Sequence, residues 1–309
     1  MAYQQGDTIT AADYNTFANN VNAVIGTGSG AKGYGLSEIT TLSAGATITA
    51  AQWNSLLSGL QKAANHQGTT LTNASNTVTT GGNILPLSNL AADITLIDTN
   101  ADNADASNMS TGQAGITSQR TDSWSGTITH TFTVNFGSQN AARHFFNSGG
   151  KIHMAFTRTG GSSTDQNTAW TDLFSGLGTV SMDADDTNKS GGSYGTNTNI
   201  GYRDLTTSNQ TIMSAPIGSG DYSANDVLIQ AKTDGSGLLT FQIDLNDDHP
   251  AGTGTFTGGG LGTAPNEGTG WTGADSVDGT VTSTVTFDKA DNASFVQVAS
   301  PSFANTATL

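Results

Sequence analysis

Hydrophobic positions near the N-terminus fall into two stretches with the same helical spacing. The first stretch, GDTITAADYNTFANNVNAVIG, begins at Gly6, and the second, GATITAAQWNSLLSGLQKAAN, begins at Gly45. In each stretch an apolar side chain returns every three to four residues, as on one face of an α-helix. The pattern predicts two amphipathic helices that pack on one another or on a partner. The helix-face residues assigned to assembly are Tyr14, Phe17, Val21, Trp53, Leu56 and Leu60.

Both stretches carry the same signals for a helix start. Thr10 and Thr49 stand at the N-cap, and Asp13 and Gln52 follow three residues later, as in a capping box. A cap contributes about 1 kcal/mol, whereas burying a helix face contributes several kcal/mol at roughly 25 cal/mol per Å². Packing must therefore decide whether this region folds. We expect a duplicated helical docking region over residues 1–86.

A third apolar stripe follows, with alternating steps of four and three residues. This period of about 3.5 predicts a helix in the segment 87–126, which we expect to contain a helix and a linker. One interpretation is an amphipathic helix on a domain surface. The other is a short parallel bundle around a symmetry axis, because isoleucine at core positions tolerates trimers. The stripe consists of Leu90, Ile94, Ile97, Ala101 and Ala104, of which the first three are further candidate assembly residues.

From Ser125 onward the hydrophobic period changes to two. GTITHTFTVNFGS places apolar side chains on one side and threonines on the other, which is typical of a half-buried strand. Similar alternation recurs towards the C-terminus, interrupted by short helical patterns such as SQNAARHFFNSGG. The predicted fold class is α+β, mainly β: duplicated N-terminal helix units precede an antiparallel β-sandwich with short helices over residues 127–309. A jelly roll is one form of this architecture.

Composition supports a β-rich chain and narrows its partners. Of 309 residues, 35% are hydrophobic, 11% are charged and 39 are Gly, which suits a virion or extracellular protein with many turns. The net charge of −15 argues against a nucleic-acid partner. The chain has no Cys, so stability must come from packing or assembly. We expect neither a membrane-spanning segment nor a secretory leader.

The motifs that could carry chemistry lack the context that the chemistry requires. G-x-G-x-x-G over Gly28–Gly33 follows a helix rather than a strand, and G-x-S-x-G over Gly191–Gly195 has no hydrophobic strand before it. Acidic clusters at 183–188 and 244–248 allow either a calcium site or a solvated turn. The five histidines show no ligand spacing, and no carboxylate pair is singled out. We expect no catalytic residue, metal or cofactor.

One segment resembles a known family. The string ITHTFTVNFGSQNAARHFFNSGGKIHMAFTR, and above all Ala142–Gly150 within it, resembles virion structural proteins of tailed bacteriophages, especially marine and cyanobacterial ones. ITAAQWNSL and HQGTT, near residues 48 to 70, look like the amino-terminal parts of the same proteins. The resemblance touches about two thirds of the chain. It implies assembly rather than catalysis and carries over no catalytic residue.

We therefore expect a non-enzymatic structural protein of a virion, in the tail or tail fibre, assembled in the host cytoplasm. Its expected partners are other copies of itself, as a trimer, and other virion proteins, which it would contact through its N-terminal helices. One alternative is a capsid decoration or head-fibre protein. The other is a receptor protein that binds or degrades a host surface glycan, in which Trp271 or Tyr222 would line an exposed groove.

Overall fold

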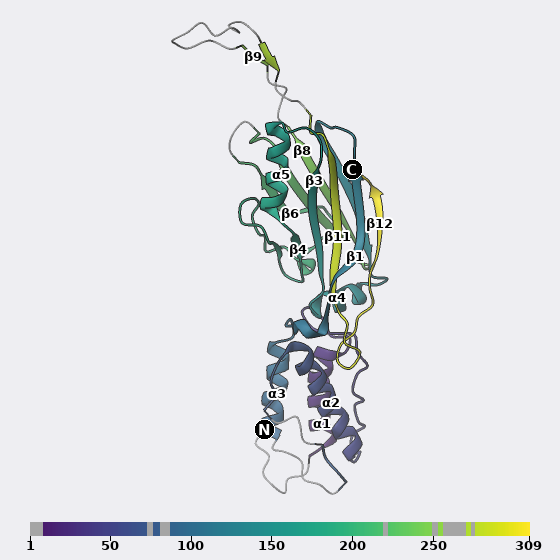
Figure 1. Ribbon diagram of the computed structural model, residues 1–309. Coiled ribbons are helices and arrows are strands. Elements are labelled where there is room, and N and C mark those ends of the chain that lie inside the picture. The colour runs from purple at the N-terminus through teal and green to yellow at the C-terminus, as the bar shows by residue number, and fades with distance from the viewer. Residues whose placement is uncertain are drawn as a thin grey trace.

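The computed structural model describes residues 9–72, 77–80, 87–218, 222–248, 253–255, 270–272 and 276–309. These residues form an α+β fold, mainly β, with five α-helices, two five-stranded antiparallel sheets and a two-stranded hairpin. The first three helices lie together at one end of an elongated molecule, and the sheets extend from them (Figure 1).

The helical end is a unit of three helices. α1 (Ala11–Ile25), α2 (Ala50–Gln67) and α3 (Leu87–Thr99) contact one another. The predicted capping boxes at Thr10 and Thr49 are both confirmed. Because each helix is amphipathic, three of them together can remove their apolar faces from water within one chain.

The predicted helix faces form the core of this unit. All of them are buried except Phe17, which is half-buried, so the helices pack on one another and these residues form no outward assembly surface. The third stripe contacts α1 and α2 rather than a symmetry axis, because those two helices already supply its apolar partners. The buried residues are Tyr14, Val21, Trp53, Leu56, Leu60, Leu90, Ile94 and Ile97.

Two antiparallel sheets make up most of the remaining structure. The first has the order β1 (Met109–Arg120), β11 (Thr280–Ala290), β3 (Lys151–Thr159), β4 (Val180–Met182) and β5 (Thr187–Lys189). The second has the order β12 (Ser302–Ala307), β2 (Gly126–Asn135), β8 (Leu238–Asp247), β7 (Asp226–Thr233) and β6 (Gln210–Pro216). A hairpin of β9 (Thr253–Thr255) and β10 (Gly270–Thr272) extends from the end opposite the helical unit (Figure 1).

The period-two pattern of β2 is confirmed. Its alternate side chains are buried, and Phe132 stacks on Phe241 of β8 with ring centroids 5.0 Å apart. Contacts also join the two sheets: Phe287 of β11 stacks on Phe303 of β12 at 5.5 Å. His130 Nδ1 lies 2.9 Å from Ser283 Oγ of β11.

The β-rich part begins at Met109, earlier than the predicted boundary at 127. β1 lies in the segment expected to be a linker, and only one of its side chains, Ser118, is buried. A strand with so little apolar alternation leaves no periodic signal. The short helix α4 (Gln139–Asn147) lies where the sequence predicts it and is capped by Ser138, and α5 (Asp165–Leu177) is a second short helix in this part.

Candidate functional site

The strongest part of the virion resemblance, Ala142–Gly150, covers most of α4 and the turn after it, where the helical unit meets the sheets (Figure 1). From α4, Arg143 donates hydrogen bonds to the carbonyls of Thr27 and Lys32, both at 2.7 Å. Asn147 Nδ2 donates to the Gly30 carbonyl at 3.0 Å. The loop after α1 is therefore held through its backbone carbonyls, which every residue type provides. We call this contact region the joint.

The other face of α4 packs into the β-rich part. Phe145 lies beside Phe287 of β11, with ring centroids 6.4 Å apart, and Phe146 stacks on Tyr202 at 4.5 Å. A Cβ at Gly150 would come within 2.5 Å of Phe145, so a residue with a side chain could not pack this closely against the end of α4. One short helix thus contacts both halves of the molecule.

Arg203 adds a charged contact to the joint. Its guanidinium pairs with Asp102, which follows α3, and with Asp185 at 2.6 Å. It also donates to Asn147 Oδ1 at 2.9 Å. Asp183 Oδ1 accepts from the amides of the next two acidic residues. The acidic turn at 183–188 is thus part of the joint, and the described residues contain no cluster suited to a metal ion.

His66 is buried at the C-terminal end of α2, beside the joint. The edge of its ring meets Tyr34, with centroids 5.1 Å apart, and neither ring nitrogen makes a hydrogen bond. Burial lowers the pKa of His66 to about 4, and the nearby Ser148 backbone and Asp105 carboxylate oppose this effect only in part. The folded protein therefore holds this imidazole neutral.

Acidification should destabilise the protein through His66. The ordinary pKa is 6.5 and the folded value is about 4, so the unfolded chain binds the proton first. The contribution of neutral His66 to the free energy of unfolding is fully present above pH 6.5 and is lost progressively towards pH 4. The loss amounts to about 3 kcal/mol, at 1.36 kcal/mol per pKa unit. Urea unfolding at pH 7 and pH 4.5 should show a smaller loss for His66→Phe than for wild type. Equal losses would contradict this role.

Three asparagine side chains hold extended segments against the helices. Each amide pairs with both the N–H and the C=O of one residue, at distances between 2.7 and 2.9 Å. Two of them, Asn15 and Asn54, occupy matching places in the two N-terminal stretches. The repeated Asn was visible in the sequence, but its role was missed. The pairs are Asn15 with Leu42, Asn22 with Ile39, and Asn54 with Val78.

Removing one such amide should measurably weaken the helical unit. Asn22→Ala would leave the buried N–H and C=O of Ile39 without their acceptor and donor, which costs about 2–4 kcal/mol at roughly 1–2 kcal/mol for each of the two groups. Asn19→Ala, exposed on the same helix, is the control and should change the free energy of unfolding by less than about 0.5 kcal/mol. Urea unfolding of both variants tests this, and equal effects would contradict it.

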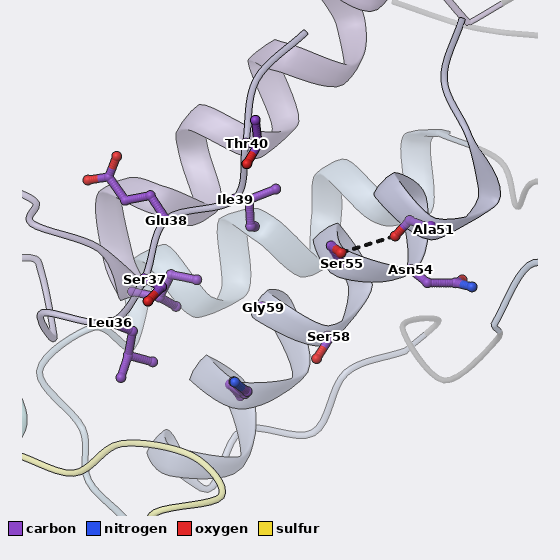
Figure 2. A pocket seen from close by; sticks show the side chains of 12 residues that line it. Leu36, Ser37, Glu38, Ile39, Thr40, Ala51, Asn54, Ser55, Ser58 and Gly59 are labelled. Carbon is purple, nitrogen blue, oxygen red and sulfur yellow. Dashed lines mark hydrogen bonds between the residues drawn. The ribbon is translucent and has the colours of Figure 1, made fainter.

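A groove lies between α2 and the extended segment 36–40 (Figure 2). Its volume is about 600 Å³. Ile39 lies above Gly59 of α2, where a Cβ would come within 2.8 Å of the Ile39 side chain. Glu38 and Lys62 are the charged side chains of the lining, and no histidine lies among them. The groove therefore offers hydroxyl, amide and apolar groups for recognition, beside these two charges.

One cross-strand contact has the composition of a hydrolytic triad. Ser181 Oγ lies 2.7 Å from His153 Nδ1, and His153 Nε2 lies 3.0 Å from Asp288 Oδ2. In catalytic triads the serine contacts Nε2 instead. Ser181 also sits in mid-strand, paired on both sides by β3 and β5, so the local backbone is committed to the sheet rather than to an oxyanion hole. The arrangement joins three strands.

Asp247, at the end of β8, is buried among neutral donors. Gln166 Nε2 lies 2.7 Å from both carboxylate oxygens, Asn225 Nδ2 lies 2.7 Å from one of them, and Trp170 Nε1 lies at 3.5 Å. Gln166 and Trp170 lie on α5, so their hydrogen bonds to the Asp247 carboxylate fasten this helix to β8. The calcium alternative for 244–248 gains no support from this geometry.

Within the described ranges, no helix combines the length and the hydropathy that crossing a membrane requires. None of the protein-family models, curated protein sequences or solved structures compared with this chain matches it. The functional argument therefore depends on the chain's own residues and geometry.

Proposed function

We propose that this chain is a non-enzymatic structural component of a tailed-phage virion, belonging to the tail or the tail fibre. The observation that carries the proposal is the joint. The motif that resembles phage virion proteins is the short helix that fastens the N-terminal unit to the sheets. Such an elongated molecule, with a helical unit at one end and a hairpin at the other, suits a part that attaches at one end and extends outward (Figure 1).

We propose that docking to neighbouring virion proteins uses the outer surface of the helical unit. The apolar helix faces are occupied inside the chain, so they cannot serve this purpose. The groove between α2 and segment 36–40 suits a partner, because its lining combines apolar side chains with hydroxyl and amide groups.

Two finer features of the fold are also proposals. Contacts such as Phe287–Phe303 support a sandwich of the two sheets. In the second sheet, β6, β7 and β8 are neighbours in chain order, which is a meander and differs from the Greek-key connections of a jelly roll. An internal duplication would explain why both Thr-capped helices carry an asparagine, Asn15 or Asn54, that pairs with the N–H and C=O of an extended segment. It would also explain why Thr16 and Ser55 each donate to the carbonyl four residues earlier.

Labelling of intact particles tests the proposed function. Antibodies against the purified chain should label the tails or fibres of phage particles from the source that encodes it. Label on the capsid surface would favour a decoration or head-fibre protein instead. Absence of the chain from purified particles would contradict any virion role.

The same purified chain tests the receptor alternative. Among the described residues, Leu96 is the one exposed large apolar side chain, and Tyr222, the groove candidate, is half-buried, so no fully exposed aromatic ring is on offer to a sugar in this part. The side chain of Trp271 lies outside the described residues. We expect no binding or cleavage across a panel of host surface glycans, and turnover of any glycan would overturn the non-enzymatic proposal.

A further inference from the structure

The edge strands of the two sheets meet along one side of the molecule. β1 and β12 belong to different sheets, but Asn305 Nδ2 donates to the Thr117 carbonyl at 3.2 Å. The Leu309 amide donates to Ser118 Oγ at 2.8 Å. β2 continues this surface because it pairs with β12. We call the surface made by β1, β12 and β2 the β1–β12 face; β1 and β12 run along the same side in Figure 1.

This face lacks the charge that marks the rest of the chain. The protein has 25 acidic and 10 basic residues, yet Arg120, at the end of β1, is the one charged residue in these three fully described strands. Some carboxylates border the face: Asp122 follows β1, Asp288 of β11 accepts a hydrogen bond from the Gly112 amide, and Asp244 of β8 accepts one from Thr129 Oγ1. Other exposed and half-buried carboxylates lie on α5, on the joint, and on β7 and the turn after it. They include Asp165, Asp172, Asp183, Asp185, Asp186, Asp226 and Asp234.

The exposed side chains of the face are small or neutral. Burying alanine, serine or threonine loses less rotamer freedom than burying lysine or glutamate. Sheet edges are commonly guarded by charged side chains, and along these two edges Arg120 at the end of β1 is the one such residue. The exposed residues include Ala114, Thr117 and Gln119 on β1 and Ser302, Ala304 and Thr306 on β12.

Backbone irregularities show which kind of contact the face allows. β1 has register shifts between Ser110 and Gln113 and between Ala114 and Ile116. β12 has another between Asn305 and Ala307. Bulges interrupt the row of hydrogen-bonding groups that an added strand would need. The face is therefore suited to side-chain packing rather than to strand addition.

We propose that the β1–β12 face is where copies of this chain pack against one another. Two chains that each carry −15 repel, and contact through this face brings together strands that carry no carboxylate of their own. The inference deepens the proposed virion role, since that role includes assembly from several copies. Its test needs no particle, so either proposal can fail without the other.

Light scattering coupled to gel filtration of the full chain tests this inference. Wild type should show a multiple of the single-chain mass of 31.5 kDa. Ala304→Asp places a carboxylate on the face of each copy and should reduce the mass to that of one chain. Thr211→Asp is the matched control, because it adds the same charge at an exposed position of β6, the opposite edge of the same sheet, and should leave the assembly intact.

Salt and a second variant make the result decisive. At about 1 M salt the Debye length falls to roughly 3 Å, so part of the Ala304→Asp assembly should return. Circular dichroism must show a native fold, and Thr117→Asp on β1 replaces Ala304→Asp if β12 does not tolerate aspartate. A single-chain mass for wild type at the highest soluble concentration would overturn the inference. So would intact assembly of the folded Asp variants, or equal dissociation of the Thr211→Asp control.

Discussion

Asp247→Ala is expected to lower the free energy of unfolding by about 3–5 kcal/mol, the range for removing one partner from a buried charged contact. The substitution leaves the N–H groups of Gln166, Asn225 and Trp170 buried without this acceptor. Since two of these donors lie on α5, the helix should loosen from the sheets. Urea unfolding measures the loss, and hydrogen exchange of the α5 amides locates it.

The neighbouring carboxylate provides the control for this prediction. Asp248 is exposed, so Asp248→Ala should change the free energy of unfolding by less than about 0.5 kcal/mol. Asp247→Asn should fall between the two, because an amide keeps the volume but turns one acceptor into a donor that faces other donors. A small effect of Asp247→Ala would show that water replaces the carboxylate there.

Gly33→Ala is expected to destabilise the joint by about 3–4 kcal/mol, from an unfavourable backbone conformation and a steric clash together. Gly33 has φ of +109°, and a Cβ there would lie 2.2 Å from the Thr27 carbonyl oxygen. That oxygen also accepts from Arg143, so the clash would disturb the contact between α4 and the loop.

Gly30 in the same motif is a matched control. It also has a positive φ, +56°, but no atom lies within 4 Å of its Cβ position. Gly30→Ala should therefore cost only the backbone term, about 1–2 kcal/mol. Thermal unfolding of the two variants measures the difference. Equal effects would mean that the close approach at Gly33 relaxes without loss.

The helical unit could be predicted well from local signals. Thr10 and Thr49 stand in capping boxes whose spacing is visible in the chain, and the apolar periods of α1 and α2 were correct. The third predicted stripe extends too far, because α3 ends at Thr99 and leaves Ala101 and Ala104 outside the helix. The partners of those helices were harder to predict. Whether Leu90 and Ile97 face α1 or another copy depends on tertiary packing, which periodicity cannot distinguish.

The joint and the edge strands could not be predicted from local sequence patterns. Arg143 reaches backbone carbonyls far away in the sequence, and backbone acceptors leave no residue-type signature. β1 is an edge strand whose side chains are small and mostly unburied, so its segment read as a linker. The Ala142–Gly150 motif indicated that α4 matters, although not that it joins two parts of the molecule.

The joint also determines how the molecule would carry tension along its length. The chain passes from the helical unit to the sheets once, through residues 100–108, and the contacts of Arg143, Asn147 and Arg203 span the same boundary. A pull on the two ends would load these bonds simultaneously rather than one after another. The protein would therefore resist extension up to one threshold force and lengthen abruptly above it.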